Sequence, residues 1–205
     1  MHLEFLVEEL SAEMALHNLL PKLVCGEHTY RIITFQGKKD LLIKLPGELR
    51  GYRKWIDNDF RIIVLIDRDR QDCHLLKNQL EEISKNANLL TKSKAIENSG
   101  FYVLNRIAIE ELEAWFFGDH QAIKAAYPRI SQTFQNKSQY RNPDQIAGGT
   151  WEALERVLKA AGYFKFGYRK TEAAVNISGY MEPLRNRSKS FQVFWSGIAG
   201  IIRPK

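Results

Sequence analysis

The sequence predicts an α/β protein in which a parallel sheet is flanked by helices and followed by a basic, mostly helical C-terminal extension. Short runs of aliphatic, β-branched and aromatic residues alternate with segments whose leucines recur at helical spacing. One run, RIIVLI at 61–66, is apolar in all but its first residue, which is typical of a parallel strand buried on both faces. This alternation favours an open parallel sheet with helices on both of its faces.

The N-terminal part of the chain supplies three predicted strands and three predicted helices. Each strand is a short apolar run, and the first and third helices are indicated by leucines on one face. Ser11 is a suitable start for the first helix. Pro46 and Gly47 interrupt the charged stretch 38–57, so only a short second helix is expected there. The predicted strands are 3–7, 30–35 and 61–66, and the predicted helices are 11–24, about 47–55 and 75–83.

The C-terminal part adds one strand and then changes character. FYVLNRIAI at 101–109 is a strand candidate, and EELEAWFF at 110–117 begins a helix. The polar stretch 128–150, with two prolines and a Gly-Gly pair, is predicted to be loop. We therefore divide the chain into an α/β domain at 1–118 and a helical basic extension at 119–205. Helices are expected in this extension at 151–161, 170–181 and 191–202.

Composition excludes several classes of protein. Of 205 residues, 44% are hydrophobic and 11% aromatic, which is enough for a buried core and argues against a disordered chain. No apolar run approaches the ~20 residues of a transmembrane helix, and no secretory signal is recognised. The two cysteines lie far apart in the sequence and fit no metal-ligand spacing. We therefore expect the protein to reside in the reducing environment of the cytoplasm.

Positive charge is concentrated towards the C-terminal end. Residues 156–205 contain ten Lys and Arg against two acids, a net charge of +8, whereas the whole chain carries +6. A basic end on a near-neutral body suggests a polyanion or an acidic partner. A solvated basic surface is the alternative interpretation.

Acidic residues follow two of the predicted strands. Glu8 comes directly after the first strand, and Asp67 and Asp69 follow the strand at 61–66. Ligands of parallel sheets bind beyond the carboxyl ends of the strands, and residues two apart on an extended strand end point the same way. Carboxylates gathered at one edge stay ionised only if a cation offsets their charge, and such oxygen ligands suit Mg²⁺ or Mn²⁺. The alternative is a solvated turn with helix-capping acids.

Three sequence blocks together resemble a known fold. FLVEE at 5–9 and LIDRDR at 65–70 are similar to the Toprim fold, a Rossmann-like α/β fold shared by topoisomerases, primases and OLD-type nucleases. In that fold a Glu closes the first strand and a D-x-D motif closes a later one. With IAIEELEAWFFGD at 107–119, the chain more specifically resembles a bacterial Toprim-like family of unassigned function, often found beside ATPases in anti-phage defence clusters. The resemblance runs over most of the chain.

The resemblance implies roles for particular acids. Glu8 matches the Glu of the first strand, but Glu9 stands where a Gly is usual, so either of the two could face the metal. Glu13 resembles a second acid of the same block, and Glu113 resembles the helix acid that related nucleases place near their metals. For Glu113, enrichment of acids at a helix N-terminus is the alternative explanation. The implied metal ligands are Glu8, Glu13, Asp67, Asp69 and Glu113.

The function implied by the resemblance is metal-dependent hydrolysis of DNA or RNA by a defence nuclease that works with a separate ATPase. One cation held by Glu8 and Asp67 would help to generate the hydroxide. A second, held by Asp69 with Glu13 or Glu113, would stabilise the leaving oxygen. Lys170, in the segment GYRKT, is the residue expected to neutralise the phosphate, so the predicted catalytic set is Glu8, Asp67, Asp69 and Lys170. The predicted nucleic-acid contacts are Lys165, Arg169, Lys170, Arg185, Arg187 and Lys189.

Two other function classes stay open. A non-catalytic Toprim-like module would bind nucleic acid or a partner ATPase without turnover. A phosphotransfer enzyme, such as a phosphatase or nucleotidyl-sugar transferase, would also use D-x-D, but the phosphatase motif usually lies on the first strand, with Thr or Val where Gln71 stands here. No P-loop and no G-x-G-x-x-G motif is present, so an ATPase activity would need another chain.

Overall fold

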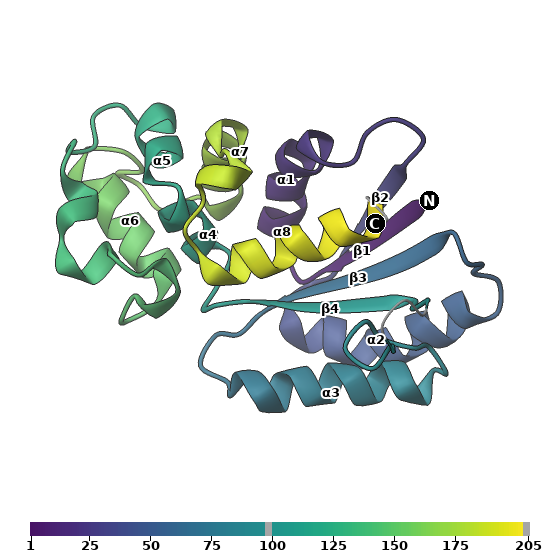
Figure 1. The fold of residues 1–205 in the computed structure, drawn as a ribbon. Coiled ribbons are helices and arrows are strands. Elements are labelled where there is room, and N and C mark those ends of the chain that lie inside the picture. The colour runs from purple at the N-terminus through teal and green to yellow at the C-terminus, as the bar shows by residue number, and fades with distance from the viewer. Residues whose placement is uncertain (97–99, 203–205) are drawn as a thin grey trace.

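A four-stranded, all-parallel sheet forms the centre of the molecule in a computed structural model, which describes residues 1–96 and 100–202. The strand order is β2-β1-β3-β4, so β2 and β4 are the edges (Figure 1). The α/β fold class and the parallel sheet predicted from the sequence are confirmed. The strands are β1 (His2–Val7), β2 (Thr29–Thr34), β3 (Phe60–Asp67) and β4 (Val103–Ala108).

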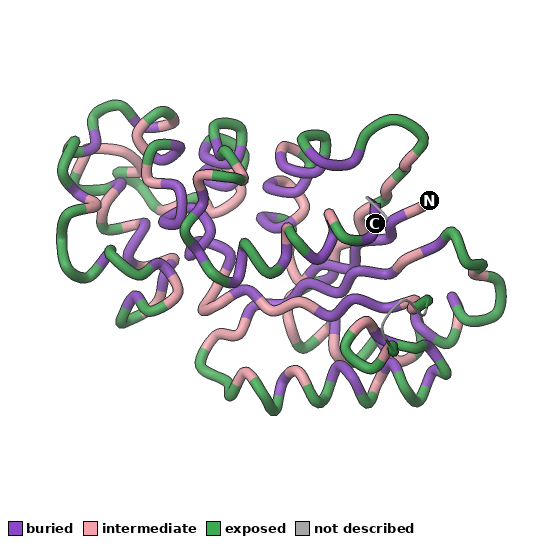
Figure 2. Tube along the Cα trace, viewed as in Figure 1, coloured by how far each residue is buried: buried purple, intermediate pink, exposed green. Residues whose placement is uncertain are grey.

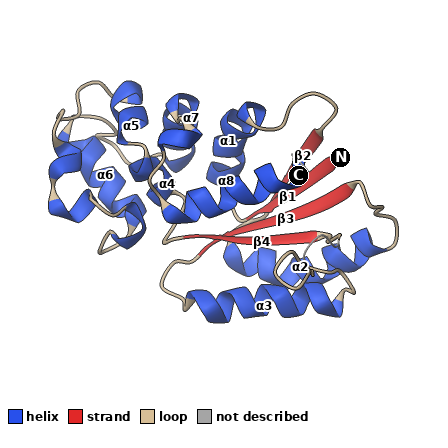
Figure 3. Cartoon of the chain, in the orientation of Figure 1, coloured by secondary structure: helices blue, strands red, loops and turns tan. Residues whose placement is uncertain are grey.

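Helices cover both faces of the sheet. On one face lie α2 (Lys38–Arg53) and α3 (Cys73–Asn86). On the other face lie α1 (Leu10–Leu19) and α8 (Lys189–Ile202), and α7 (Lys170–Tyr180) packs outside α1. Figures 1 and 3 show the sheet between these two layers.

The two central strands are buried on both faces, as the apolar run at 61–66 predicts. Ile63 and Leu65 of β3 contribute to the core beneath α1 and α8. Their neighbours Ile62 and Val64 contribute to the core beneath α2 and α3. Successive side chains of a strand point to opposite faces, so the apolar residues of this strand alternate between the two halves of the core, and the strand is buried along most of its length (Figure 2).

The second helix is longer than the sequence suggested. We expected only a short helix at about 47–55, but α2 runs over Lys38–Arg53 and passes through Pro46. Leu41, Leu45 and Leu49 recur every four residues and are completely buried against the sheet. Their burial outweighs the backbone hydrogen bond that proline removes, and Pro46 itself lies on a half-exposed side of the helix.

The segment after residue 118 is mostly helical, as predicted. It contains α5 (His120–Ala126), α6 (Thr150–Ala160), α7 and α8, and the stretch between α5 and α6 consists of loop with three short 3₁₀ turns, η2 (Phe134–Asn136), η3 (Ser138–Tyr140) and η4 (Pro143–Gln145). Side chains from both sides of residue 118 share one buried core. Arg203 and Lys205, two of the C-terminal basic residues, lie outside the described residues. Among the described helices, none combines the length and hydrophobicity that a bilayer crossing requires.

The packing of α2 predicts a large difference between two aliphatic residues of this one helix. Leu45→Ala removes a fully buried side chain and is expected to lower the free energy of unfolding by about 2–5 kcal/mol. The matched control is Ile43→Ala, because Ile43 is 67% exposed on the same helix and should change stability by less than about 0.5 kcal/mol. Urea denaturation measures both, and equal effects would contradict the burial of this face.

Candidate functional site

The carboxyl ends of all four strands meet at one edge of the sheet, because the strands are parallel. Helices α4 (Glu113–Gly118), α5, α6 and α7 gather at this end of the sheet (Figure 1). Glu8 is the first residue after β1, and Asp67 is the last residue of β3. The expectation that these two acids share one edge is therefore confirmed by the topology.

The Glu8 side chain contacts the backbone of Asp67. The Glu8 carboxylate accepts a hydrogen bond from the Asp67 amide at 3.1 Å. Glu8 is half-buried, and Asp67 is buried. Glu9 instead accepts a hydrogen bond from the Ser11 hydroxyl at 2.6 Å and lies 3.4 Å from the Lys170 ammonium. Of the two neighbouring glutamates, Glu8 is thus the one that contacts Asp67.

Glu113 brings a third carboxylate to this edge from the first turn of α4. Its side chain is only 1% exposed, and its Oε2 atom has no hydrogen-bond partner among the described residues. We expected the helix to begin at Glu110, but it begins at Glu113. The difference arises because the Glu110 carbonyl accepts a hydrogen bond from the Asp69 amide and Glu111 is used elsewhere, so these residues connect the strand to the helix.

Lys170, the first residue of α7, supplies positive charge to the cluster of Glu8, Glu9, Asp67 and Glu113, which we call the acid cluster. Burial acts to lower the pKa of Lys170, but Glu113, Glu9 and Asp67 raise it more, and the net pKa lies above the usual lysine value. The ammonium is therefore charged and held among carboxylates. The fold thus already holds one positive charge, the Lys170 ammonium, among these carboxylates.

One lysine does not balance the charge of the cluster. Burial raises the pKa of Asp67 well above the usual aspartate value, and the charges of Glu8 and Glu113 raise it further. Burial also raises the pKa of Glu8, and it raises that of Glu113 to about 7 despite the opposing effect of Lys170. Mutual repulsion of buried carboxylates is the condition that a bound cation relieves.

Asp69 lies apart from Asp67, contrary to the expectation that the two side chains point the same way. Strand β3 ends at Asp67, and the backbone of Asp69 adopts a left-handed conformation with φ of 51°. Aspartate tolerates this conformation better than most residues, and the bond from its amide to the Glu110 carbonyl holds the turn. The Asp69 carboxylate is 45% exposed and lies 2.5 Å from the Lys38 ammonium.

Lys38 is a site residue that the sequence analysis missed. It begins α2, the helix after β2, so the same rule that selected Glu8 and Asp67 could have selected it. Its ammonium also donates to the Arg68 carbonyl at 3.1 Å. Lys38 and Asp69 line a pocket of about 390 Å³ together with Trp151.

Glu111 has a structural role. Its carboxylate accepts hydrogen bonds from the amides of Thr150 and Trp151 and from the Thr150 hydroxyl, and so satisfies donors at the start of α6. These three hydrogen bonds attach α6 to the segment between β4 and α4. The Trp151 ring then lies beside the Lys170 ammonium, 5.7 Å from it, and stacks on Tyr168.

The other predicted ligand, Glu13, is engaged away from the acid cluster. It accepts a hydrogen bond from the Thr34 hydroxyl at 2.5 Å and lies 3.5 Å from the His17 ring. These contacts join α1 to the end of β2. The structure therefore groups Glu8, Asp67 and Glu113 around Lys170, with Asp69 beside Lys38, and it does not bring Glu13 to them.

The predicted nucleic-acid contacts have different surroundings. Arg185 donates two hydrogen bonds to the Asp119 carboxylate, both at 2.8 Å, so its charge is used within the fold. Arg169 pairs with Glu172 at 3.0 Å. Lys165 and Arg187 are exposed, and Lys189 is exposed at the start of α8.

The donor chemistry of the acid cluster fits Mg²⁺ or Mn²⁺. Carboxylate oxygens are the ligands that these hard cations prefer, and the unpartnered Oε2 of Glu113 is an acceptor without a donor. With the side chains as they stand, the described residues contain no group of three or more His, Cys, Asp or Glu that could hold a metal ion. Coordination by Glu8, Asp67 and Glu113 would therefore require their carboxylates to rotate towards a shared point.

Comparison with known proteins gives one family. The sequence model described as "Domain of unknown function (DUF4276)" matches residues 7–199, which is most of the chain. No curated protein and no solved structure shows significant similarity to the chain.

Burial of Glu113 predicts an unusual pH dependence of stability in metal-free solution. The folded carboxyl keeps its proton up to about pH 7, whereas the unfolded chain releases it near 4.5, so stability falls as the pH rises through this window. Glu113→Gln removes this loss and should stabilise the protein by roughly 3 kcal/mol above about pH 7, with little effect near pH 5. Urea denaturation with a chelator present measures this difference.

Glu27→Gln is the control for this measurement, because Glu27 is exposed and loses the same charge. It should leave the pH dependence unchanged. A Glu113→Gln protein that is less stable than wild type at high pH would show that the carboxylate is well compensated, which contradicts the description above.

Proposed function

The chain belongs to the DUF4276 family, and we propose that it is a metal-dependent nuclease that hydrolyses phosphodiester bonds of DNA or RNA. The observation that carries the proposal is the acid cluster. Carboxylates from the end of β1, from β3 and from α4 meet at the carboxyl edge of a parallel sheet, around a half-buried lysine. The edge is where such sheets bind their ligands.

The resemblance to Toprim-like nucleases assigns the same residues. Glu8 follows the first strand, Asp67 closes a later strand, and Glu113 lies on a following helix, as in the sequence pattern of those proteins. These three acids are the proposed metal ligands. Asp69 lies beside Lys38, and we keep it as a residue of the site because its charge helps to raise the pKa of Glu8. We no longer propose Glu13, because its carboxylate already binds Thr34.

A bound Mg²⁺ or Mn²⁺ would polarise the phosphoryl oxygens and lower the pKa of a water molecule. The residues of the chain then have distinct tasks. The Lys170 ammonium is charged and half-buried, and it lies 3.4 Å from the Glu9 carboxylate, so it can offset the charge that develops on a phosphoryl oxygen. Glu113 keeps its proton up to about pH 7 without metal, so binding of the metal would release this proton and leave the carboxylate as a ligand.

A polyanionic substrate is consistent with the distribution of charge. Exposed Lys165, Arg187 and Lys189 remain available for phosphate contacts, since the described structure gives none of them a carboxylate partner. The resemblance also implies a separate ATPase subunit and a role in anti-phage defence, and we include both in the proposal.

Replacement of Asp67 tests the proposal. Asp67→Asn keeps the size of the side chain and removes a buried charge, so it should leave the protein folded. It should lower Mg²⁺- or Mn²⁺-dependent cleavage of plasmid, single-stranded DNA or tRNA by on the order of a hundredfold. Gel analysis of the substrates measures the loss.

Asp59→Asn is the matched control, because Asp59 is an exposed aspartate just before the opposite end of the same strand. It should cleave like wild type. Cleavage by Asp67→Asn at the wild-type rate would contradict the assignment. Nucleic-acid binding by wild type with no cleavage in either metal, with or without its ATPase, would support a non-catalytic binding module instead.

A further inference from the structure

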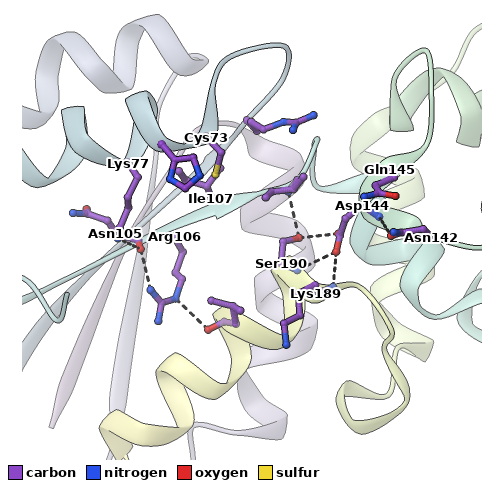
Figure 4. Close-up of a pocket in the computed structure, with 14 residues that line it drawn as sticks. Cys73, Lys77, Asn105, Arg106, Ile107, Asn142, Asp144, Gln145, Lys189 and Ser190 are labelled. Carbon is purple, nitrogen blue, oxygen red and sulfur yellow. Dashed lines mark hydrogen bonds between the residues drawn. The ribbon is translucent and has the colours of Figure 1, made fainter.

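A second pocket, of about 580 Å³, lies on the open edge of the sheet beside β4. Its walls come from α3, from the end of β4, from η4 and from the start of α8. Figure 4 shows Lys77 and Cys73 on one side and Lys189 and Asp144 on the other. The pocket is separate from the acid cluster, since Glu8, Glu9, Asp67 and Glu113 do not line it.

Positive charge dominates the lining. It includes Arg68, Lys77, Arg106 and Lys189, against the single acid Asp144. Arg68 pairs with Glu110, and Lys77 pairs with Glu81, just outside the pocket. Arg106 and Lys189 form no ion pair with any described residue, although the charge of Glu81, which pairs with Lys77, also acts on Arg106.

Arg106 is held rigidly within this charged group. Its guanidinium donates hydrogen bonds to the carbonyls of Val193 and Asn105, both at 3.1 Å (Figure 4). Neither partner carries a charge. Burial lowers the pKa of Lys77 and of Lys92, and the nearby charge of Arg106 lowers both further. An anion in the pocket would relieve this repulsion.

The one acid in the lining is already used. Asp144 accepts hydrogen bonds from the hydroxyls of Ser188 and Ser190 and from the amides of Lys189 and Ser190. It thus satisfies the free amides at the start of α8. Its charge is turned towards these donors, which leaves the cations as the groups available to a ligand.

The remaining lining suits a base. Ile107, Ile109 and Val193 offer apolar contact. The side-chain amide of Gln145 can donate and accept hydrogen bonds, and that of Asn142 can donate, since its oxygen already accepts from the Asp144 amide at 3.2 Å. The volume lies in the range of about 300–1,000 Å³ that is usual for small-molecule sites. The lining matches the parts of a nucleotide: the cations suit its phosphate, and the apolar wall and the amide groups suit its base.

We propose that the pocket between α3, β4 and α8 binds one nucleotide, with its phosphate at Arg106 and Lys189 and its base against Ile107 and Val193. The nucleotide could be free, or it could be one unit of a nucleic-acid strand. Arg68 lines the pocket and lies between Asp67 and Asp69 in the chain, so a strand held here would continue past Arg68 towards the acid cluster. Binding in this pocket does not depend on the proposed nuclease activity.

Cys73 makes the proposal testable, because its free, half-buried thiol lines the pocket. In a Cys25→Ser protein, Cys73 is the only thiol, and its alkylation rate reports on occupancy. With a chelator present, saturating dAMP or a short oligodeoxyadenylate should slow alkylation by roughly tenfold. Lys189→Glu should abolish the protection. The matched control is Lys85→Glu, which makes the same charge change outside the pocket: Lys85 is on α3, the helix that carries Cys73, and its side chain is 75% exposed. This control should keep the protection.

Each outcome has a definite meaning. Protection by dAMP assigns the pocket to a free nucleotide, and protection by the oligonucleotide alone assigns it to one unit of a strand. No protection by either probe, or full protection in the Lys189→Glu protein, would overturn the proposal. Protection by the oligonucleotide, with no cleavage of that oligonucleotide when Mg²⁺ is restored with or without the ATPase, would contradict the nuclease function and leave the nucleotide pocket standing.

Discussion

The repulsion between buried carboxylates at one sheet edge is the constraint on which the proposed site depends. Asp67 is the last residue of a strand that is buried on both faces, so its side chain cannot move far from Glu8 and Glu113. The fold offsets this repulsion with one half-buried lysine and with raised pKa values of the acids. A group of this kind costs stability, which is expected where side chains are placed for binding or chemistry rather than for packing.

The rest of the fold positions this edge. Parallel strands bring residues far apart in the sequence to one place, and α7 packs along α1, which sets Lys170 beside Glu9. Glu111 attaches α6 to the segment between β4 and α4. This contact sets the position of Trp151, whose ring lies beside the Lys170 ammonium. The neighbouring pocket, which Arg68 lines, is instead rich in cations. The two surroundings have opposite charge and lie next to each other along the chain, an arrangement that suits a substrate held by its phosphates.

The sequence predicted elements whose signal is local. Short, mainly apolar runs predicted the strands. The rule that ligands bind beyond the carboxyl ends of parallel strands predicted that Glu8 and Asp67 share one edge, because this rule needs only the residues that follow each strand. Three features needed tertiary contacts that no local pattern contains. Helix α2 continues through Pro46 because its leucines are buried, and Asp69 turns away because the Glu110 carbonyl binds its amide. Lys38 joins the site only because β2 and β3 are both neighbours of β1.

The thermal unfolding midpoint as a function of Mn²⁺ concentration tests the central claim most directly. If the acid cluster binds a cation, Mn²⁺ will raise the midpoint of the wild-type protein in a saturable way, because a ligand of the folded state stabilises it. Asp67→Asn will be the more stable protein without metal and will respond little to Mn²⁺. A wild-type midpoint that does not change with Mn²⁺, or an equal rise in both proteins, would contradict the account.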